Sequence, residues 1–311
     1  MNPRITPYLI LFIFSLSGAY WASLPKKRSS GERSWLVLKE RLSSLSYINP
    51  SVKVEIDFSS SWVRVFSRKN GKITATDEFL ASKAINDLRE KMADVKARKV
   101  IGSYEKIDSG EYGFEGEEKT ILSLNTTSEI YEFEVGKRSF QSSDVYLRDM
   151  QRQEVILSPN KAINIVINAT SRLFKRNIVD FKLSEDVSHI DLSFGGRDIN
   201  LIPSKEGGGN VMWRITGQTT AHESLSNWLK RFVGLKLKKY ADESQVFDGN
   251  QVFSASFQLN SGSRESVTIS LKEDKKHRSQ YWLKSSGSPR HVLLDPNRTK
   301  TLLRDLENFS I

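Results

Sequence analysis

Val155-Ile156-Leu157-Ser158-Pro159-Asn160-Lys161 is the most informative stretch of this sequence, because it returns 137 residues later (292 minus 155) as Val292-Leu293-Leu294-Asp295-Pro296-Asn297-Arg298. Four of the seven positions are identical in the two stretches. Each runs from apolar residues into a serine or aspartate and then a proline, which are favoured at the N-cap and the first position of a helix. The stretch therefore predicts a strand followed at once by a helix, over residues 162–169 in the first copy and 299–306 in the second.

The sequence upstream of these stretches also recurs in the same order. Residues 145–148 (VYLR) resemble residues 281–284 (YWLK), and residues 56–58 (IDF) resemble residues 190–192 (IDL). Because the matches keep their order at nearly constant spacing, they indicate a duplication with changes in loop length. We therefore predict an α+β fold built from two tandem repeats of a module of antiparallel sheet plus helices. The predicted repeats are residues 51–183 and residues 184–311.

Alternating apolar and polar residues predict strands near the start of the first repeat. Residues 52–58 (VKVEIDF) and residues 62–66 (WVRVF) alternate with a period of two, as expected for a half-buried sheet. Asn70-Gly71 follows them, and Gly195-Gly196 follows a strand of the second repeat. Both pairs tolerate the positive φ angles of a tight turn, so they predict antiparallel hairpins in the two repeats.

Apolar residues at helical spacing predict one longer helix in each repeat. The first covers residues 77–97, with Asp77 as its N-cap. The second opens at Thr220 with Glu223 three residues later, which is a capping box, and ends at Gly234. Four aromatic residues are interpreted as core rather than as the lining of a sugar or lipid groove: Trp213, Trp228, Phe232 and Trp282.

The N-terminal end carries a hydrophobic segment. Residues 8–22 are almost continuously apolar, and residues 5–24 approach the roughly 20 residues that a membrane-spanning helix needs. Two interpretations stay open, a cleaved signal peptide with Ser17-Gly18-Ala19 as its cleavage site and a retained anchor. We favour an anchor over residues 1–24, because the apolar run continues past that site. Residues 25–50 are predicted to form a basic linker and a short amphipathic helix over residues 34–45.

The 311 residues carry a formal net charge of +10 and include no cysteine. The lack of cysteine excludes disulfides, thiolate zinc sites, iron–sulfur clusters and cysteine nucleophiles. The positive charge favours anionic partners, but no nucleic-acid-binding motif accompanies it, so no nucleic acid is expected. The basic residues that we single out as a candidate partner or anionic-surface contact are Lys230, Arg231, Lys236, Lys238 and Lys239.

The sequence offers little for catalysis. Its four histidines stand apart, with no pair at metal-ligand spacing. Gly207-Gly208-Gly209 lacks the lysine and hydroxyl residue of a phosphate-binding P-loop, so it is interpreted as a flexible hairpin loop. No G-x-S-x-G or S-x-x-K motif occurs with the partners that it would need. We therefore predict no enzyme activity, no catalytic residues, no metal site and no cofactor.

Several segments together resemble one known family. They are the V-x-I-x-F strand at residues 54–58, the helix at 85–92, Y-x-F-x-x-G-K at 131–137, V-Y-L-R at 145–148, and the strands at 154–157 and 211–216. The pattern is similar to that of the domain-of-unknown-function 4340 family, bacterial proteins that are usually membrane-anchored and often encoded beside ABC transporters of the gliding-motility type. The resemblance covers nearly everything after Ser51. It implies an envelope location and an accessory role beside a transporter, but it supplies no chemistry.

The two repeats match this family pattern incompletely. Repeat 1 has Lys72 where the pattern has a tryptophan, and Gly136-Lys137 has no clean equivalent in repeat 2. The motifs are structural, and the family offers no catalytic motif to transfer.

Three hypotheses about function follow. The first is a non-enzymatic, membrane-anchored envelope protein, an accessory or partner-binding component of an ABC-transporter-type or gliding-type assembly. It would sit in the bacterial inner membrane with a single span and a periplasmic body, although Lys26, Lys27 and Arg28 after the segment argue for the opposite orientation. The second is a periplasmic binding module for an anionic polymer or lipid. The third is a hydrolase with a dispersed site. A small-molecule ligand is not identified by any of them.

Overall fold

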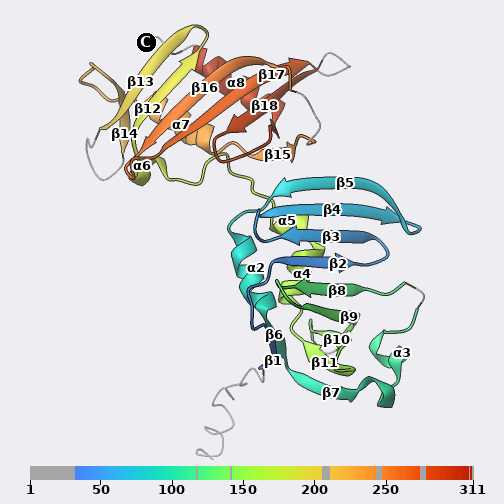
Figure 1. Ribbon diagram of the computed structural model, residues 1–311. Helices are drawn as coiled ribbons and strands as arrows, with labels where there is room; N and C mark the ends of the chain where they lie inside the picture. The colour runs from blue at the N-terminus through green and yellow to red at the C-terminus, as the bar shows by residue number, and fades with distance from the viewer. Residues whose placement is uncertain are drawn as a thin grey trace, which may run out of the picture.

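The computed structural model describes residues 32–116, 118–140, 142–204, 211–242, 247–273, 278–307 and 309. The predicted membrane anchor and the triple-glycine loop lie outside these described residues. In the described part the chain forms mostly strands, arranged in three antiparallel sheets with helices packed against them (Figure 1). No helix of this part is long and apolar enough to cross a membrane. The predicted combination of antiparallel sheets with helices is confirmed at this level.

The N-terminal half of the chain forms a nine-stranded sheet and a small two-stranded sheet. The nine strands, in chain order, are β2 (Ser44–Ile48), β3 (Val52–Asp57), β4 (Trp62–Lys69), β5 (Lys72–Leu80), β7 (Lys99–Ser103), β8 (Ile121–Asn125), β9 (Ile130–Arg138), β10 (Val145–Asp149) and β11 (Glu154–Ser158). They lie side by side in the order β5-β4-β3-β2-β8-β9-β10-β11-β7. The small sheet pairs β1 (Arg33–Val37) with β6 (Asp94–Ala97).

The C-terminal half forms an eight-stranded sheet. Its strands are β12 (Val187–Phe194), β13 (Arg197–Ser204), β14 (Met212–Ile215), β15 (Leu237–Tyr240), β16 (Asn250–Leu259), β17 (Arg264–Glu273), β18 (Ser279–Ser285) and β19 (Val292–Leu294). Their order across the sheet is β14-β13-β12-β16-β17-β18-β19-β15. Neighbouring strands in it are antiparallel, so hairpin connections account for most of the sheet.

The helical segments are α2 (Ala84–Ala93), the 3-10 turn η1 (Tyr104–Lys106), α3 (Ser109–Tyr112), α4 (Lys161–Ile167), α5 (Ala169–Arg172), α6 (Leu183–Asp186), α7 (Glu223–Val233) and α8 (Pro296–Glu307). Helices α2 and α4 cover one face of the first sheet, and α7 and α8 cover one face of the second. On the other face of the first sheet, η1 and α3 contact Arg148 and Tyr146 of β10. In the N-terminal half, Leu88 of α2 and Val166 of α4 are fully buried against the sheet. In the C-terminal half, α7 and α8 pack together over the sheet, and Trp228 Nε1 of α7 donates to the Leu302 carbonyl oxygen of α8 at 2.8 Å. The four aromatic residues predicted to be core are all buried.

The hairpin predictions are confirmed. Asn70 and Gly71 connect β4 to β5 with φ angles of 50° and 73°, and Gly195 and Gly196 connect β12 to β13 with φ angles of 54° and 76°. Two successive positive φ angles match the twist of the flanking strands, which is why asparagine and glycine occupy these turns.

The predicted helix over residues 34–45 is wrong. The chain forms β1 and β2 there, and Leu45 and Tyr47 of β2 alternate toward the core. Leucines three or four residues apart fit a helix, but β2 is inserted between β3 and β8 and pairs with both along its whole length. Long-range pairing therefore overrides the local spacing.

The ends of three predicted helices also differ from the structure. Asp77 does not cap a helix, because β5 continues to Leu80 and α2 begins at Ala84. At its other end α2 stops at Ala93, because residues 94–97 form β6 instead of continuing the helix. Ser158 is the last residue of β11, two residues before the N-cap of α4. The predicted capping box of Thr220 and Glu223 does not form, since α7 begins at Glu223 with His222 as its N-cap. Asp295 does cap α8 as predicted, since its Oδ1 accepts the Arg298 amide at 3.0 Å. The strand partners of β5 and β11 hold the chain extended for longer than the local pattern indicates.

Gly136 of β9 lies where no larger residue fits. A Cβ atom there would come within 2.3 Å of the Tyr112 carbonyl oxygen and 2.9 Å of the Phe114 ring. Gly136→Ala is expected to lower the free energy of unfolding by about 1–3 kcal/mol, because α3 must shift away from the sheet. Urea denaturation measures this loss. Gly287→Ala is the matched control, since its nearest neighbour would be 3.9 Å from the new Cβ. An equal loss in both variants would contradict the steric account.

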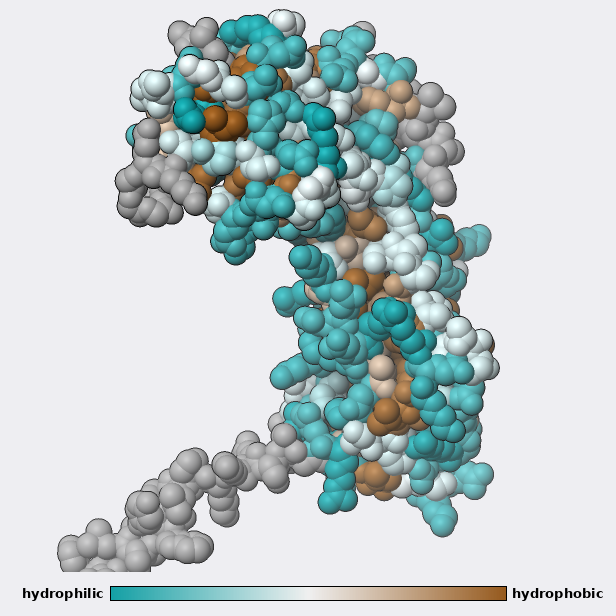
Figure 2. Space-filling model, turned by 60° about the vertical axis from the view of Figure 1, so that its left-hand side comes forward, coloured by the Kyte–Doolittle hydropathy of each residue, from teal (hydrophilic) through white to brown (hydrophobic). Residues whose placement is uncertain are grey.

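A few direct contacts join the two halves of the molecule, where the surface is indented in Figure 2. Glu78 at the edge of the first sheet bonds Arg290 of the C-terminal half at 2.5 Å, and its other oxygen accepts Arg64 Nε at 2.8 Å. The Arg290 guanidinium lies 4.2 Å from the centre of the Trp62 ring. Trp62 in turn meets the buried Tyr240 ring edge-on at 5.5 Å. The junction therefore combines an aromatic pair with a carboxylate held between two arginines.

This junction is expected to weaken in acid. Burial acts to raise the pKa of Glu78, but the hydrogen bonds from Arg290 and Arg64 outweigh it and hold the pKa below the usual 4.5. A lowered folded-state pKa contributes stability that is present above the unfolded pKa and is lost as the pH falls through the folded one. At pH 7, Glu78→Gln should therefore cost about 1–3 kcal/mol, and the difference from wild type should shrink at pH 3. Urea denaturation at both pH values measures it; Glu132→Gln, exposed on the same sheet, is the control. A cost independent of pH would contradict the assignment.

Candidate functional site

An apolar pocket of about 370 Å³ opens between α2, α4 and the first sheet. Leu122, Phe133 and Leu147, from three adjacent strands, form its floor, and each is at most 2% exposed. Met92 at the end of α2 and Val95 of β6 close one side. A volume near the lower end of the range for ligand sites, with an almost entirely apolar floor, suits a hydrophobic group of modest size. We call it the α2–α4 pocket.

The pocket follows from the way in which two helices meet the sheet. The apolar positions of α2, Ile85, Leu88 and Met92, lie on one face and bury it against the strands. After Ala93 the chain leaves the helix and pairs with β1 instead of continuing over the sheet. On the other side, β11 continues to Ser158 and α4 begins only at Lys161. The floor between these two points is therefore only partly covered.

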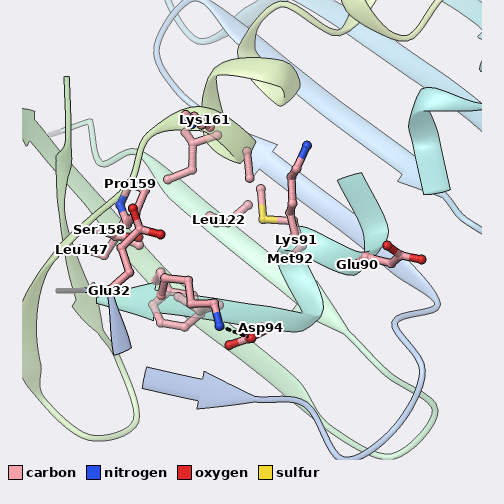
Figure 3. Close-up of a pocket in the computed structure, with 15 residues that line it drawn as sticks. Glu32, Glu90, Lys91, Met92, Asp94, Leu122, Leu147, Ser158, Pro159 and Lys161 are labelled. Atoms are coloured by element: carbon pink, nitrogen blue, oxygen red, sulfur yellow. Dashed lines mark hydrogen bonds and ion pairs between the residues drawn. The ribbon is translucent and has the colours of Figure 1, made fainter. Parts of the chain in front are cut away.

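Charged residues of both signs surround the opening. Three lysines and three carboxylates line it: Lys91, Lys96, Lys161, Glu32, Glu90 and Asp94. In Figure 3, Met92 and Leu122 lie in the middle of the pocket, Lys91 and Lys161 lie on the two helices that border it, and the Glu90 carboxylate points away. The charges balance, so the rim has no net attraction for an anion or a cation.

Two polar contacts tie the rim to the first residues that the structure describes. Asp94 forms an ion pair with Lys96, and Lys96 also donates to Ser34 Oγ at 3.0 Å. Burial acts to raise the pKa of Asp94, but the hydrogen bonds from Lys96 and Ser34 and the positive charge of Lys96 together outweigh it, so the pKa lies below the usual value. Glu32 bonds Arg98 at 2.9 Å, and Arg98 also bonds the buried Asp144 at 2.9 Å. These contacts therefore hold the Glu32 and Asp94 side of the rim in place against the N-terminal half of the molecule.

The lining can serve as a binding surface. Among the described residues that line the pocket, Ser158 carries the hydroxyl group, and there is no histidine. No group of three or more His, Cys, Asp or Glu residues that could hold a metal ion occurs among the described residues. An apolar floor with a charged rim can bury a hydrophobic group and bond polar atoms beside it.

The sequence matches the model of a family described as a domain of unknown function, DUF4340, over residues 74–251. This region is more than half of the chain. The protein belongs to the DUF4340 family. The predicted resemblance is confirmed by this match. In this DUF4340 protein, the matched region begins in β5 and ends in β16, so it includes most of the α2–α4 pocket. Of the junction it includes Glu78 and Tyr240. No curated protein and no solved structure matches the chain.

The basic residues singled out from the sequence lie away from the α2–α4 pocket of this DUF4340 protein. Lys230 and Arg231 are on α7, Lys236 precedes β15, and Lys238 and Lys239 are within β15. Arg231 bonds Asp305 at 2.9 Å, Lys238 bonds Asp295 at 2.7 Å, and Lys236 donates to Asn177 Oδ1 at 2.7 Å. Two of the five charges are thus paired with carboxylates and a third lies at the junction. Their role as a partner or anionic-surface contact stays a prediction.

The four histidines lie in separate places. His189 Nε2 is 2.6 Å from Asp191 Oδ1, and His222 Nε2 is 2.6 Å from Gln218 Oε1. His291 stacks on Phe247 with ring centres 4.1 Å apart, and burial lowers its pKa. His277 lies outside the described residues. Each described histidine therefore has its own local contact.

Sequence reasoning missed the α2–α4 pocket. Leu122 falls in none of the segments singled out from the sequence, and Phe133 and Leu147 fall in segments of the family pattern, while Met92 falls in the predicted helix over residues 77–97. The pocket lies where α2 ends at Ala93 and α4 begins at Lys161. The sequence pattern extends the first helix to residue 97, so it does not indicate this gap.

Proposed function

We propose that this protein is a non-enzymatic, membrane-anchored binding component of an ABC-transporter-type or gliding-type envelope assembly. In this proposal the α2–α4 pocket holds an apolar segment of a membrane protein partner. The observation that carries it is the position of the pocket: its apolar floor opens beside Glu32, a few residues after the hydrophobic segment of the sequence. A protein anchored there would present the pocket close to the bilayer surface.

The length of the connecting sequence supports this placement. Eight residues run from Pro25 to Glu32, after the apolar segment that ends near Leu24. Even a fully extended chain of that length reaches only roughly 30 Å, at about 3.3–3.6 Å per residue. An anchored protein would therefore keep the pocket within reach of the loops and helix ends of a membrane partner.

The balanced rim favours a polypeptide over an anionic ligand. A polypeptide offers apolar side chains for the floor together with amide and charged groups for lysines and carboxylates around it. An anionic lipid or polymer would meet Glu32 and Asp94 as well as the lysines. The alternative, a periplasmic module for an anionic polymer or lipid, rests on the overall charge of +10 and on the basic residues of α7 and β15.

A duplicated architecture is part of the same proposal. Without β2, the first sheet has the strand order β5-β4-β3-β8-β9-β10-β11-β7, and the second has β14-β13-β12-β16-β17-β18-β19-β15. When the strands of each sheet are numbered in chain order, these two orders are the same, so the two sheets share one topology. Helices α2 and α7 follow the corresponding strands β5 and β14, and α4 and α8 follow β11 and β19. These matches support tandem repeats near residues 51–183 and 184–311, with β1, β2 and β6 as additions to the first.

The less favoured hydrolase hypothesis needs carboxylates from both repeats in one pocket. The polar groove at the junction has Glu55, Asp57 and Glu78 from the N-terminal half, and Arg290 from the C-terminal half. Among its described lining residues, the carboxylates all come from one side. Nothing in this arrangement favours hydrolysis over binding.

Removal of residues 1–24 tests the anchored function. The full chain should fractionate with membranes and co-purify from detergent with a transmembrane subunit of a transporter. The shortened chain should move to the soluble fraction and lose that subunit, while retaining its thermal unfolding transition. If location and partner are both unchanged, the proposal fails.

The orientation can be tested separately, because the chain has no cysteine. Phe140 is fully exposed, so Phe140→Cys introduces one reactive thiol without disturbing the core. A periplasmic body predicts labelling by a membrane-impermeant maleimide in cells whose outer membrane is permeabilised. Labelling only after lysis would place the body in the cytoplasm and would agree with the basic residues after the segment.

A further inference from the structure

A second concave site lies on the opposite face of the first sheet from α2 and α4. It is a polar groove of about 420 Å³ that ends at the junction with the C-terminal half. We call it the junction groove. Unlike the α2–α4 pocket, it is lined mainly by serine, carboxylate, amide and guanidinium groups.

The register of the strands aligns the polar side chains of the groove in two rows. Ser46, Glu55, Arg64 and Glu78 stand directly opposite one another across β2, β3, β4 and β5. Side chains directly opposite in an antiparallel pair lie on the same face and close together. The first row is therefore a continuous line of hydrogen-bonding groups that leads to Arg290 at the junction.

The second row runs parallel to the first. Asn125, Ser44, Asp57 and Trp62 stand opposite one another across β8, β2, β3 and β4. Asn125 Nδ2 donates to Ser44 Oγ at 2.9 Å. Burial acts to raise the pKa of Asp57, but hydrogen bonds from Ser59 and Ser60 outweigh it and lower the pKa to about 2. Asp57 is therefore an ionised acceptor at any physiological pH.

The end of the groove adds an aromatic surface. Trp62 is partly exposed into the groove, and one side of its ring is covered by Arg290. Glu78 fixes Arg290 in this position. The site thus combines planar carboxylate, amide and guanidinium groups with one aromatic residue. Arg290, from the other half of the molecule, lines its end.

This combination matches one ligand class. Adjacent hydroxyl groups of a sugar both donate and accept, so they pair with carboxylates, amides, hydroxyls and guanidinium groups at once. The C–H face of a sugar ring packs on an aromatic surface. Three carboxylates and two arginines line the groove, which gives no excess positive charge for an anionic polymer. From this geometry we propose that the junction groove binds a neutral saccharide of one or two rings.

The proposal is independent of the partner-binding function and is tested with the full chain in detergent. Isothermal titration with chitobiose, cellobiose and maltose is the first experiment, and at least one should bind saturably. Glu55→Gln keeps the shape of the groove but replaces an anionic acceptor, and should weaken that binding about tenfold. Glu132→Gln is the matched control and should leave binding unchanged, because Glu132 is exposed on β9 of the same sheet, separated from β3 by β2 and β8, and does not line the groove.

Four results would overturn the proposal. One is the absence of binding by all three disaccharides, and another is equal binding by wild type and Glu55→Gln. The third is equal weakening by Glu132→Gln. The fourth is tighter binding of the zwitterion glycylglycine than of any disaccharide, since carboxylate and arginine groups would then be recognising opposite charges instead of hydroxyls. Thermal unfolding of each variant shows whether a loss of binding reflects loss of the fold.

Discussion

Trp228→Ala is expected to lower the free energy of unfolding by about 3–5 kcal/mol, the range for removing a large buried aromatic side chain. Trp228 is fully buried between α7, α8 and the second sheet. Its ring stacks on Phe232 at 5.4 Å and packs against Phe253 at 5.8 Å, and its Nε1 bonds the Leu302 carbonyl oxygen. The substitution removes the side chain that packs α7 and α8 against the sheet. It also takes a hydrogen-bond donor away from the buried Leu302 carbonyl oxygen.

Urea denaturation of wild type and variant measures this loss. Phe140→Ala is the control, because Phe140 is fully exposed and its removal should change stability by less than about 0.5 kcal/mol. If Trp228→Ala cost no more than this control, the C-terminal half could not depend on the α7–α8 contact that the structure shows.

Ala162→Trp is expected to abolish binding of the partner without unfolding the protein. Ala162 lines the α2–α4 pocket at the start of α4 and is partly exposed, so a larger side chain can enter the cavity from the rim. An indole that fills the pocket competes directly with an apolar segment of a partner. Recovery of the transporter subunit in a detergent co-purification should fall at least tenfold, which corresponds to about 1.4 kcal/mol of binding free energy.

Thr170→Trp is the matched control for this experiment. Thr170 is exposed on α5 and does not line the pocket, so the same bulk is added to a neighbouring helix. Wild-type recovery with Thr170→Trp and loss with Ala162→Trp would support the pocket as the binding site. Equal recovery from both variants would contradict it.

Local patterns predicted the parts of the fold that depend on a few neighbouring residues. The Asn70-Gly71 turn and the Asp295-Pro296 helix start are set by backbone angles and by one side-chain bond, and both are confirmed. The buried aromatic residues of α7 were predicted from helical spacing alone. The helix assigned to residues 34–45 failed, because strand β2 is stabilised by β3 and β8, and β8 lies about eighty residues away in sequence.

Neither concave site could be predicted, for a related reason. The α2–α4 pocket exists because the end of one helix and the beginning of another lie over Leu122 and Phe133 without meeting. The junction groove depends on the register that sets Ser46 opposite Glu55 and on Arg290 reaching Glu78 from the other half of the chain. A sequence pattern contains neither the register nor these distant approaches.

Photocrosslinking in intact membranes tests most directly whether the α2–α4 pocket holds an apolar segment of a membrane protein partner. The photoreactive residue benzoylphenylalanine is placed at Ala162 or, as control, at Thr170. We predict an adduct from Ala162, but not from Thr170, that mass spectrometry identifies as a transmembrane subunit of a transporter, with the attached peptide rich in apolar residues. Equal adducts from both positions, an adduct of lipid mass alone, or no adduct from Ala162 would contradict the claim.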